Sequence, residues 1–259
     1  TDKTVEKLRT KAKNKVQKNK NAKKALSALD KGGVLDHDII SQLSPAVQEA
    51  IQDGAEIAFQ PNTGPQTDFL ASPEKEVLYG GAAGGGKSYA MLMDLLRYAD
   101  NKNCRALLLR RTLAELTELI DKSKQIYPKA FPKARFKESV KTWEFPSGAT
   151  AMFSYVDKDD DVYRYQGQSF TWIGIDELGH YPTPYVWNYL RSRLRTTDPD
   201  VQTYMRASAN PGGSGGWWVK KMFVDPNPPN QPFWATDIES NKVLTYGKNH
   251  EKANQPLFQ

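Results

Sequence analysis

Short apolar runs alternate along the chain with longer stretches in which apolar residues recur at helical spacing. Four runs predict strands, at residues 76–79, 104–111, 171–176 and 201–207. Three stretches predict helices, at residues 88–98, 112–127 and 184–195. Because parallel strands are usually joined through helices, this alternation predicts an α/β fold with a mostly parallel central sheet flanked by helices.

The region between the second and third predicted strands has a pattern of its own. The helix there should begin at Thr112, because Thr112 as N-cap and Glu115 three residues later form a capping box. Residues 128–141, with two prolines and mixed charges, predict an irregular excursion. Residues 142–155 then predict a β-hairpin with its turn at residues 146–148.

The two ends of the chain differ from this core. Residues 1–31 are lysine-rich with a thin apolar stripe, which predicts an amphipathic helix or pair of helices. Such a helix could lie along a phosphate backbone, and a solvated, charged arm fits the pattern equally well. We therefore predict a basic helical arm or small lid at residues 1–58 and a core at residues 59–225. The proline-rich start of residues 226–259 predicts an extended linker.

Charge is distributed unevenly along the chain. The net charge is +6, yet residues 1–31 hold eleven Lys or Arg against three Asp or Glu, and the remainder holds 25 against 27. The basic character therefore belongs to the arm. The single cysteine, Cys104, excludes an internal disulfide, and three histidines give no zinc-binding pattern. No run of eighteen apolar residues occurs, so we expect a soluble chain without a membrane span.

The strongest motif is the phosphate loop, or P-loop, GAAGGGKS, between the first predicted strand and the first predicted helix. Glycines leave backbone N–H groups free to surround phosphate oxygens, the lysine adds a point charge, and the serine hydroxyl is a Mg²⁺ ligand. The predicted phosphate-binding residues are Gly81, Ala82, Ala83, Gly84, Gly85, Gly86, Lys87 and Ser88. A nucleoside triphosphate is the expected ligand.

A second motif, TWIGIDE, ends the third predicted strand in two acids. An apolar strand ending in Asp-Glu downstream of a P-loop is a Walker B arrangement. Asp176 would hold the Mg²⁺ water shell, and Glu177, on the other side of the strand, would polarise the attacking water.

Polar residues near these motifs are candidates for nucleotide recognition. Gln60 and Gln66 lie in residues 59–71, predicted as a loop, and a terminal amide can pair with the adenine ring; we favour Gln66. Ser208 and Asn210 follow the fourth predicted strand, where they could sense the γ-phosphate.

Arginines gather at the ends of two predicted elements. Arg110 and Arg111 end a parallel strand, where α/β sheets place ligands, although salt bridges to neighbouring acids explain them equally well. Arg191, Arg193 and Arg195 occupy the last turn of a predicted helix. Cations at a helix C-terminus interact favourably with the helix dipole, which explains some of these arginines. Three arginines exceed what this interaction needs, so one of them could act on phosphate.

Taken together, the segments resemble the large terminase subunits of tailed bacteriophages, the ATPases that pump genomic DNA into the procapsid. The matching segments are FQPNTGPQTDFLAS, YGGAAGGGKS, LLLRRT, YQGQSFTWIGIDE, YLRSRLRTTDP and RASANPGGSGGWWVKKMF, which cover residues 59–224 in order.

The resemblance implies a P-loop NTPase fold of the additional-strand type, with ATP and Mg²⁺ as cofactors. The implied roles are adenine contact for Gln66, phosphate and Mg²⁺ binding for Lys87 and Ser88, the Walker B carboxylate for Asp176, catalysis for Glu177, and coupling of hydrolysis to DNA movement for Ser208, Ala209 and Asn210. Implied partners are double-stranded DNA, a portal protein, a small terminase subunit and copies of this chain in a pentameric ring, with a monomer in isolation. The implied location is the host cytoplasm, with transient docking on the procapsid.

Two departures from the family pattern matter. The P-loop contains no arginine, so a finger would come from Arg164, Arg191 or Arg193 in trans. The clustered aspartates of a ribonuclease-H-like nuclease do not occur in this chain, so we expect an ATPase domain without that activity.

Proteins with other functions contain the same motifs. Another additional-strand motor, such as a helicase, would have the same core residues. A DNA-binding assembly module with a structural nucleotide would hold that nucleotide unhydrolysed and bind DNA through residues 1–31. The chain shows no acceptor-site pattern, which argues against a small-molecule kinase. It contains no Asn-Lys-x-Asp stretch, which argues against specificity for guanine.

Overall fold

The computed structural model of the chain describes residues 61–237, 242–245 and 255. All of these belong to the second of the two compact units into which the chain divides, Ala58–Gln259. The predicted arm or lid at residues 1–58, and Gln60, lie outside the described residues.

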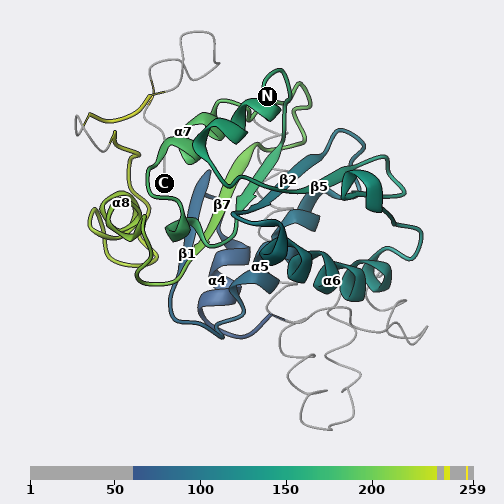
Figure 1. The fold of residues 1–259 in the computed structure, drawn as a ribbon, viewed down its shortest axis with the longest axis horizontal. Helices are drawn as coiled ribbons and strands as arrows, with labels where there is room; N and C mark the ends of the chain where they lie inside the picture. Colours follow the sequence, from purple (N-terminus) through teal and green to yellow (C-terminus); the bar gives the residue numbers. More distant parts are fainter. Residues whose placement is uncertain (1–60, 238–241, 246–254, 256–259) are drawn as a thin grey trace, which may run out of the picture. The chain divides into compact units, whose positions relative to one another are not determined.

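A mixed sheet forms the centre of the described unit (Figure 1). Its seven strands are β1 Glu76–Gly80, β2 Arg105–Arg110, β3 Arg135–Lys137, β4 Thr142–Glu144, β5 Thr150–Tyr155, β6 Trp172–Ile175 and β7 Tyr204–Ala209. Their order is β1-β7-β6-β2-β5-β4-β3, and the first five in that order are parallel. The predicted hairpin is confirmed, because β4 pairs antiparallel with β5. Strand β7 lies between β1, which leads into the P-loop, and β6, which Asp176 follows, and this is the predicted additional-strand arrangement.

Helices cover both faces of this sheet. They are α4 Pro65–Ala71, α5 Lys87–Asp94, α6 Leu113–Ala130, α7 Tyr185–Arg191 and α8 Gly216–Val219. Figure 1 shows α5 and α6 on one face and α7 on the other. None of the described helices is long and apolar enough to cross a membrane.

Strand β2 shows why both faces are buried. Its Ala106 and Leu108 pack in the core cluster that contains α5 and α6, whereas Leu107 and Leu109 pack in the cluster that contains α7 and α8. All four side chains are buried. Because successive side chains of a strand point to opposite faces, a continuous apolar run indicates a strand covered on both sides.

The predicted loop before β1 is wrong in part, because residues 65–71 form α4. Pro65 occupies the first turn of the helix, where the missing N–H has no intrahelical partner to lose. Gln66 and Phe69 are its buried side chains. Seven residues beside several prolines show too little periodicity to predict a helix from the sequence.

The boundaries of α6 and the following excursion also differ from expectation. The capping box at Thr112 is confirmed, but the helix continues through Pro128, where a proline near the C-terminus removes only one hydrogen bond. The predicted excursion contains β3, which pairs with β4 so that Phe136 lies opposite Trp143. Their ring centroids are 5.3 Å apart, a packing contact that local sequence does not reveal.

Helix α7 is shorter than predicted. It ends at Arg191, so Arg193 and Arg195 lie beyond its last turn. The chain leaves the helix because Leu194 forms a parallel bridge with Phe170, supported by a hydrogen bond from Phe170 N to Arg193 O of 2.9 Å.

Candidate active site

The P-loop joins β1 to α5 at the carboxyl edge of the sheet. Gly81, Gly84 and Gly86 have φ values of 140°, 83° and 71°, which side chains with a Cβ rarely adopt. Gly86 is the N-cap of α5. A hydrogen bond of 3.2 Å from Gly81 N to Ala209 O joins the loop to the end of β7. The predicted loop therefore stands between strand and helix, as a phosphate cradle requires.

Lys87 lies inside this loop. Its Nζ donates to Gly81 O at 3.0 Å and to Ala82 O at 2.6 Å, and the residue is buried. Tyr79 donates from its hydroxyl to Gly85 O at 2.8 Å. Burial raises the pKa of Tyr79, which keeps this hydroxyl a donor. The only side-chain cation of the motif is thus held against the loop backbone.

Gln66 of α4 contacts the other side of the loop. Its Oε1 accepts from Asn62 N at 2.6 Å, and its Nε2 donates to Gly86 O at 2.9 Å. The φ of 71° at Gly86 favours glycine, and a Cβ there would lie 2.6 Å from that Nε2, so the amide would have to move. The residue is 3% exposed and both ends of its amide are engaged with protein, so it braces the P-loop here. Its role in reading adenine stays a prediction.

Asp176 follows β6 and collects three donors. Its Oδ2 accepts from Ser88 Oγ at 3.0 Å and from Arg110 Nε at 2.9 Å. Its Oδ1 accepts a short hydrogen bond from Ser208 Oγ. Asp176 is 1% exposed, and burial of a carboxylate is costly unless it has such hydrogen-bond partners. The two predicted motifs and the end of β7 therefore meet at one carboxylate.

Glu177, the next residue, has a left-handed backbone with φ of 61°. Its backbone N donates to Ser208 Oγ at 3.0 Å, so Ser208 contacts both acids. The carboxylate Oε2 lies 3.1 Å from Arg110 NH1 and 3.2 Å from His180 Nε2. The side chain is 24% exposed, which leaves it accessible to water.

Arg110 is the residue of the site whose role the sequence left open. Its buried guanidinium pairs with both Asp176 and Glu177, with NH2 at 2.7 Å from Asp176 Oδ2. The salt-bridge alternative is thus confirmed, and the partners are the two Walker B acids. Arg111 also forms a salt bridge, with its Nε 3.9 Å from Asp157 Oδ1, and its NH1 donates to His180 O at 2.6 Å. The signal available in the sequence was the position of both arginines at the end of a parallel strand.

Ala209 and Asn210 complete the carboxyl end of β7. Ala209 supplies the carbonyl that binds Gly81 N. The Oδ1 of Asn210 is buried without a hydrogen-bond partner in the part of the chain that the structure describes. An unpaired polar atom in a residue that follows this P-loop contact is consistent with recognition of a polar ligand.

Two oxygen atoms of the site, Ser88 Oγ and Asp176 Oδ2, are suitable ligands for a Mg²⁺ ion. These two atoms lie 3.0 Å apart, and Mg²⁺ is usually held through one or two carboxylates and keeps several waters. Glu115, Glu177 and His180 also place potential ligand atoms within 4.8 Å of one another. However, Glu115 is engaged in the capping box of α6 and Glu177 in the contact with Arg110.

The three finger candidates lie apart from this cluster. Arg164 is exposed and bonds Tyr155 O at 2.7 Å and Asp161 O at 3.2 Å. Arg193 donates to Ser192 Oγ and lies over the Tyr189 ring at 5.3 Å.

Arg191 has the strongest contacts of the three finger candidates. It holds Glu76 through bonds of 2.6 and 2.7 Å. Glu76 is the first residue of β1, at the opposite edge of the sheet from the P-loop. This pairing favours a structural role for Arg191.

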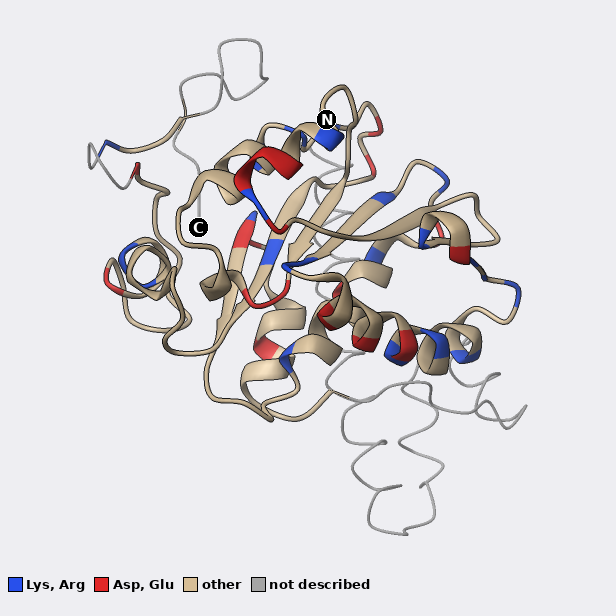
Figure 2. Ribbon diagram, viewed as in Figure 1, with Lys and Arg blue, Asp and Glu red and all other residues tan. Residues whose placement is uncertain are grey.

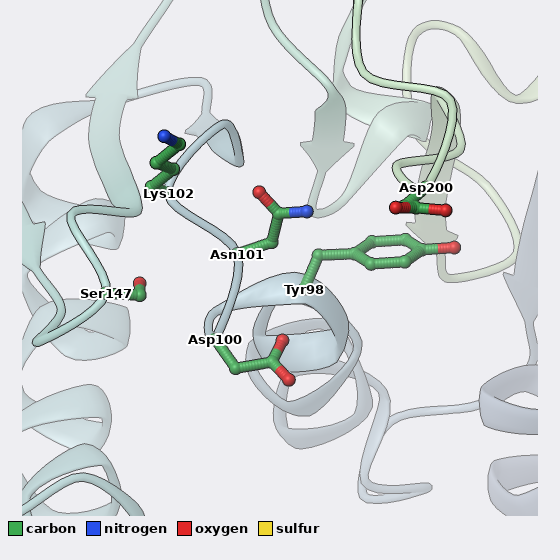
Figure 3. A pocket seen from close by; sticks show the side chains of 6 residues that line it. All are labelled: Tyr98, Asp100, Asn101, Lys102, Ser147 and Asp200. Carbon is green, nitrogen blue, oxygen red and sulfur yellow. The ribbon is translucent and has the colours of Figure 1, made fainter.

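A separate cavity of about 540 Å³ lies near the amino ends of β2 and β7 (Figure 3). Its lining residues are Tyr98, Asp100, Asn101, Lys102, Ser147 and Asp200. None of the predicted site residues lines it.

The family comparison agrees with the site. The sequence model of the family described as "Terminase large subunit, T4likevirus-type, N-terminal" matches residues 78–246. The chain belongs to the terminase large subunit family. The matched part of this terminase contains the P-loop, both Walker B acids and the end of β7. No curated protein sequence matches the chain.

Solved structures of large terminases are similar to this chain, and that of bacteriophage D6E, with a TM-score above 0.5, shows the same fold. The large terminase of the thermophilic bacteriophage D6E is similar with a TM-score of 0.53 and 18% identity, over 64% of this chain and 43% of that chain. The bacteriophage HK97 large terminase has a TM-score of 0.48 and 12% identity, over 62% and 36%. The large terminase ATPase domain of Thermus phage P74-26 has a TM-score of 0.46 and 13% identity, over 69% and 73%. This terminase chain thus spans less than half the length of the D6E and HK97 proteins.

Proposed function

We propose that this chain binds ATP with Mg²⁺ in its P-loop and hydrolyses it to drive double-stranded DNA into a viral procapsid. The observation that carries the proposal is the meeting of Ser88, Asp176 and Ser208 through direct hydrogen bonds, with Lys87 and Glu177 adjacent in the chain. The large terminase of D6E, which has this fold, forms complexes with ATP-γ-S and with ADP.

Each residue then has a defined task. The loop amides and Lys87 bind the phosphates, and Ser88 and Asp176 hold the cation. Mg²⁺, when bound, neutralises charge on the phosphate oxygens. Glu177 orients a water molecule and accepts its proton. Arg110 holds both acids in place, because NH2 of its guanidinium contacts Asp176 and NH1 contacts Glu177.

The charge that develops on the phosphates also requires a donor that the P-loop lacks. We assign this task to an arginine of a neighbouring copy in a ring, with Arg164 and Arg193 as candidates. Arg191 stays a weaker candidate because Glu76 already binds its guanidinium. We further propose a pentameric ring, contact with a portal protein and a small terminase subunit, and action in the host cytoplasm while docked on the procapsid. The predicted division into arm, core and linker remains part of this proposal.

Replacing Glu177 tests the proposal most directly. We expect Glu177→Ala to bind ATP with wild-type affinity and to lose turnover by at least about 10²-fold, since general base catalysis contributes that much. ATP binding by calorimetry and phosphate release would be measured on the same preparations. Undiminished phosphate release in Glu177→Ala, or a wild type that holds ATP without releasing phosphate, would refute hydrolysis at this site. The second result would favour an assembly module with a structural nucleotide.

A further inference from the structure

His180 lies directly against the carboxylate of Glu177. The left-handed backbone of Glu177 starts the 3₁₀ turn η4, Leu178–His180, in which His180 N donates to Glu177 O at 3.0 Å. This turn brings the imidazole back over the preceding residue, so that Nε2 is 3.2 Å from Glu177 Oε2. An N–H at Nε2 would hydrogen-bond this oxygen, and the imidazolium form carries a second N–H at Nδ1.

The other ring nitrogen of His180 is placed near a second carboxylate. His180 Nδ1 lies 3.7 Å from Glu115 Oε1. Glu115 is itself fixed in space, because its Oε2 accepts from Thr112 N at 3.2 Å in the capping box of α6. The imidazole therefore stands between one carboxylate held by a helix terminus and another at the end of a strand.

The backbone of His180 is also held from two sides. His180 O accepts from Arg111 NH1 at 2.6 Å and from Ser214 Oγ at 2.9 Å. Gly179 O accepts from Gly215 N at 2.9 Å, and a Cβ at Gly213 would lie 2.6 Å from that same oxygen. The segment after β7 thus packs closely on the turn and determines where the imidazole stands.

We propose that His180 is a positioning residue for hydrolysis, which holds the Glu177 carboxylate in one orientation while Glu115 orients the imidazole. The inference rests on the proposed function. Glu177 Oε2 has two neighbours, Arg110 NH1 and His180 Nε2, on different elements. A base oriented by a second group, which is oriented in turn by a third, is a recurrent catalytic arrangement. The side chain of His180 is 38% exposed, so apolar core packing does not account for its placement.

Steady-state kinetics of four variants would test this role. We expect His180→Ala to lower kcat roughly 10-fold, as loss of an orienting partner typically does, with KM for ATP within about twofold of wild type. His180→Gln retains an amide donor and should recover most of that loss. Glu115→Gln should give a smaller decrease, because glutamine preserves the capping box but removes the charge facing Nδ1. Glu118→Gln, on the same helix in an exposed pair with Lys122, is the matched control and should leave kcat unchanged.

The contact itself can be measured without turnover. The chain has three histidines, so the ¹⁵N resonances of the His180 ring can be assigned from their loss in His180→Gln. Glu177→Gln should shift the Nε2 resonance at constant pH, and Glu118→Gln should not. An unshifted resonance, or a kcat of His180→Ala within twofold of wild type, would overturn the positioning role.

Two further outcomes are decisive. Equal losses in His180→Ala and His180→Gln, accompanied by lower melting temperatures, would show a structural residue and also overturn the proposal. A wild-type protein that binds ATP without hydrolysing it would instead overturn the proposed function. This outcome needs no variant, so it is distinguishable from a failure of the His180 proposal.

Discussion

The two edges of the same sheet use arginine–carboxylate pairs in different ways. At the amino edge, Glu76 accepts from Nε and NH2 of Arg191 and from Trp187 Nε1 at 3.0 Å, so all of these donors serve one carboxylate. At the carboxyl edge, Arg110 is shared between two acids, and Asp176 Oδ2 is shared between Arg110 and Ser88. The first arrangement is complete within the protein, whereas the second contains adjacent negative charges that a bound cation would balance.

A third pair lies in the interior and resembles the amino edge. Asp94, at the end of α5, binds Arg97, Arg206 and Trp172 Nε1. Arg206 also donates to the carbonyls of Ser72 and Glu74, which tie the entry to β1 onto β7. Figure 2 shows that α6 also carries both signs of charge, with acidic residues in its first part and lysines in its later part. Paired charges are therefore common in the described core, and the carboxyl edge differs from the other two places because one guanidinium, that of Arg110, contacts two different carboxylates.

The largest expected effect on turnover is that of removing the arginine finger. The position of the finger would show which edge of the sheet faces a neighbouring subunit. The Arg164 guanidinium donates to the carbonyl of Tyr155 at the carboxyl end of β5, whereas the backbone carbonyl of Arg193 accepts from Phe170 N just before β6. Removing the true finger should lower turnover by on the order of 10³-fold. Phosphate release by Arg164→Ala and Arg193→Ala would be measured at increasing protein concentration.

Mixing experiments provide the control for this prediction. A finger variant and Glu177→Ala each lack what the other supplies, so their mixture should recover activity in trans. Wild-type rates in both arginine variants, or no recovery in any mixture, would contradict a finger at these positions.

Arg110→Ala should have the next largest effect. Without the shared guanidinium, the two Walker B acids lose their common partner, and we expect kcat to fall on the order of 10²-fold. Arg110→Lys should recover little, because an ammonium group cannot contact both carboxylates in the same geometry. The measurement is phosphate release over a range of Mg²⁺ concentrations. A variant with normal kcat would show that the two edges of the sheet do not differ in function.

Arg191→Ala should lower the free energy of unfolding and leave kcat unchanged. It leaves the buried Glu76 without its cation, and breaking a pair of this kind costs about 3 kcal/mol. Chemical denaturation would report the loss, with Arg195→Ala, an exposed neighbour, as the control. A fall in kcat at low temperature with unchanged unfolding free energy would instead place Arg191 in the active site.

Local motifs determined the centre of the site. The eight residues of the P-loop and the strand ending in Asp176 and Glu177 are contiguous, and their geometry follows from glycine conformations, helix initiation and strand periodicity. The α/β class, the hairpin and the capping box at Thr112 follow from the same short-range rules, because each depends on residues close together in the chain.

Only the tertiary structure decided which charged residues become partners. Arg110 and Asp176 are 66 residues apart, and Arg191 and Glu76 are 115 apart, so the order of strands in the sheet selects each pair. The sequence equally allowed Arg110 to contact a ligand or to form salt bridges with neighbouring acids. It allowed Arg191 to act on phosphate or to cap its helix. The short helix α4, the strand β3 and the place of His180 between two carboxylates likewise depend on what packs against them. Long-range packing determines these features, and no local pattern in the chain encodes it.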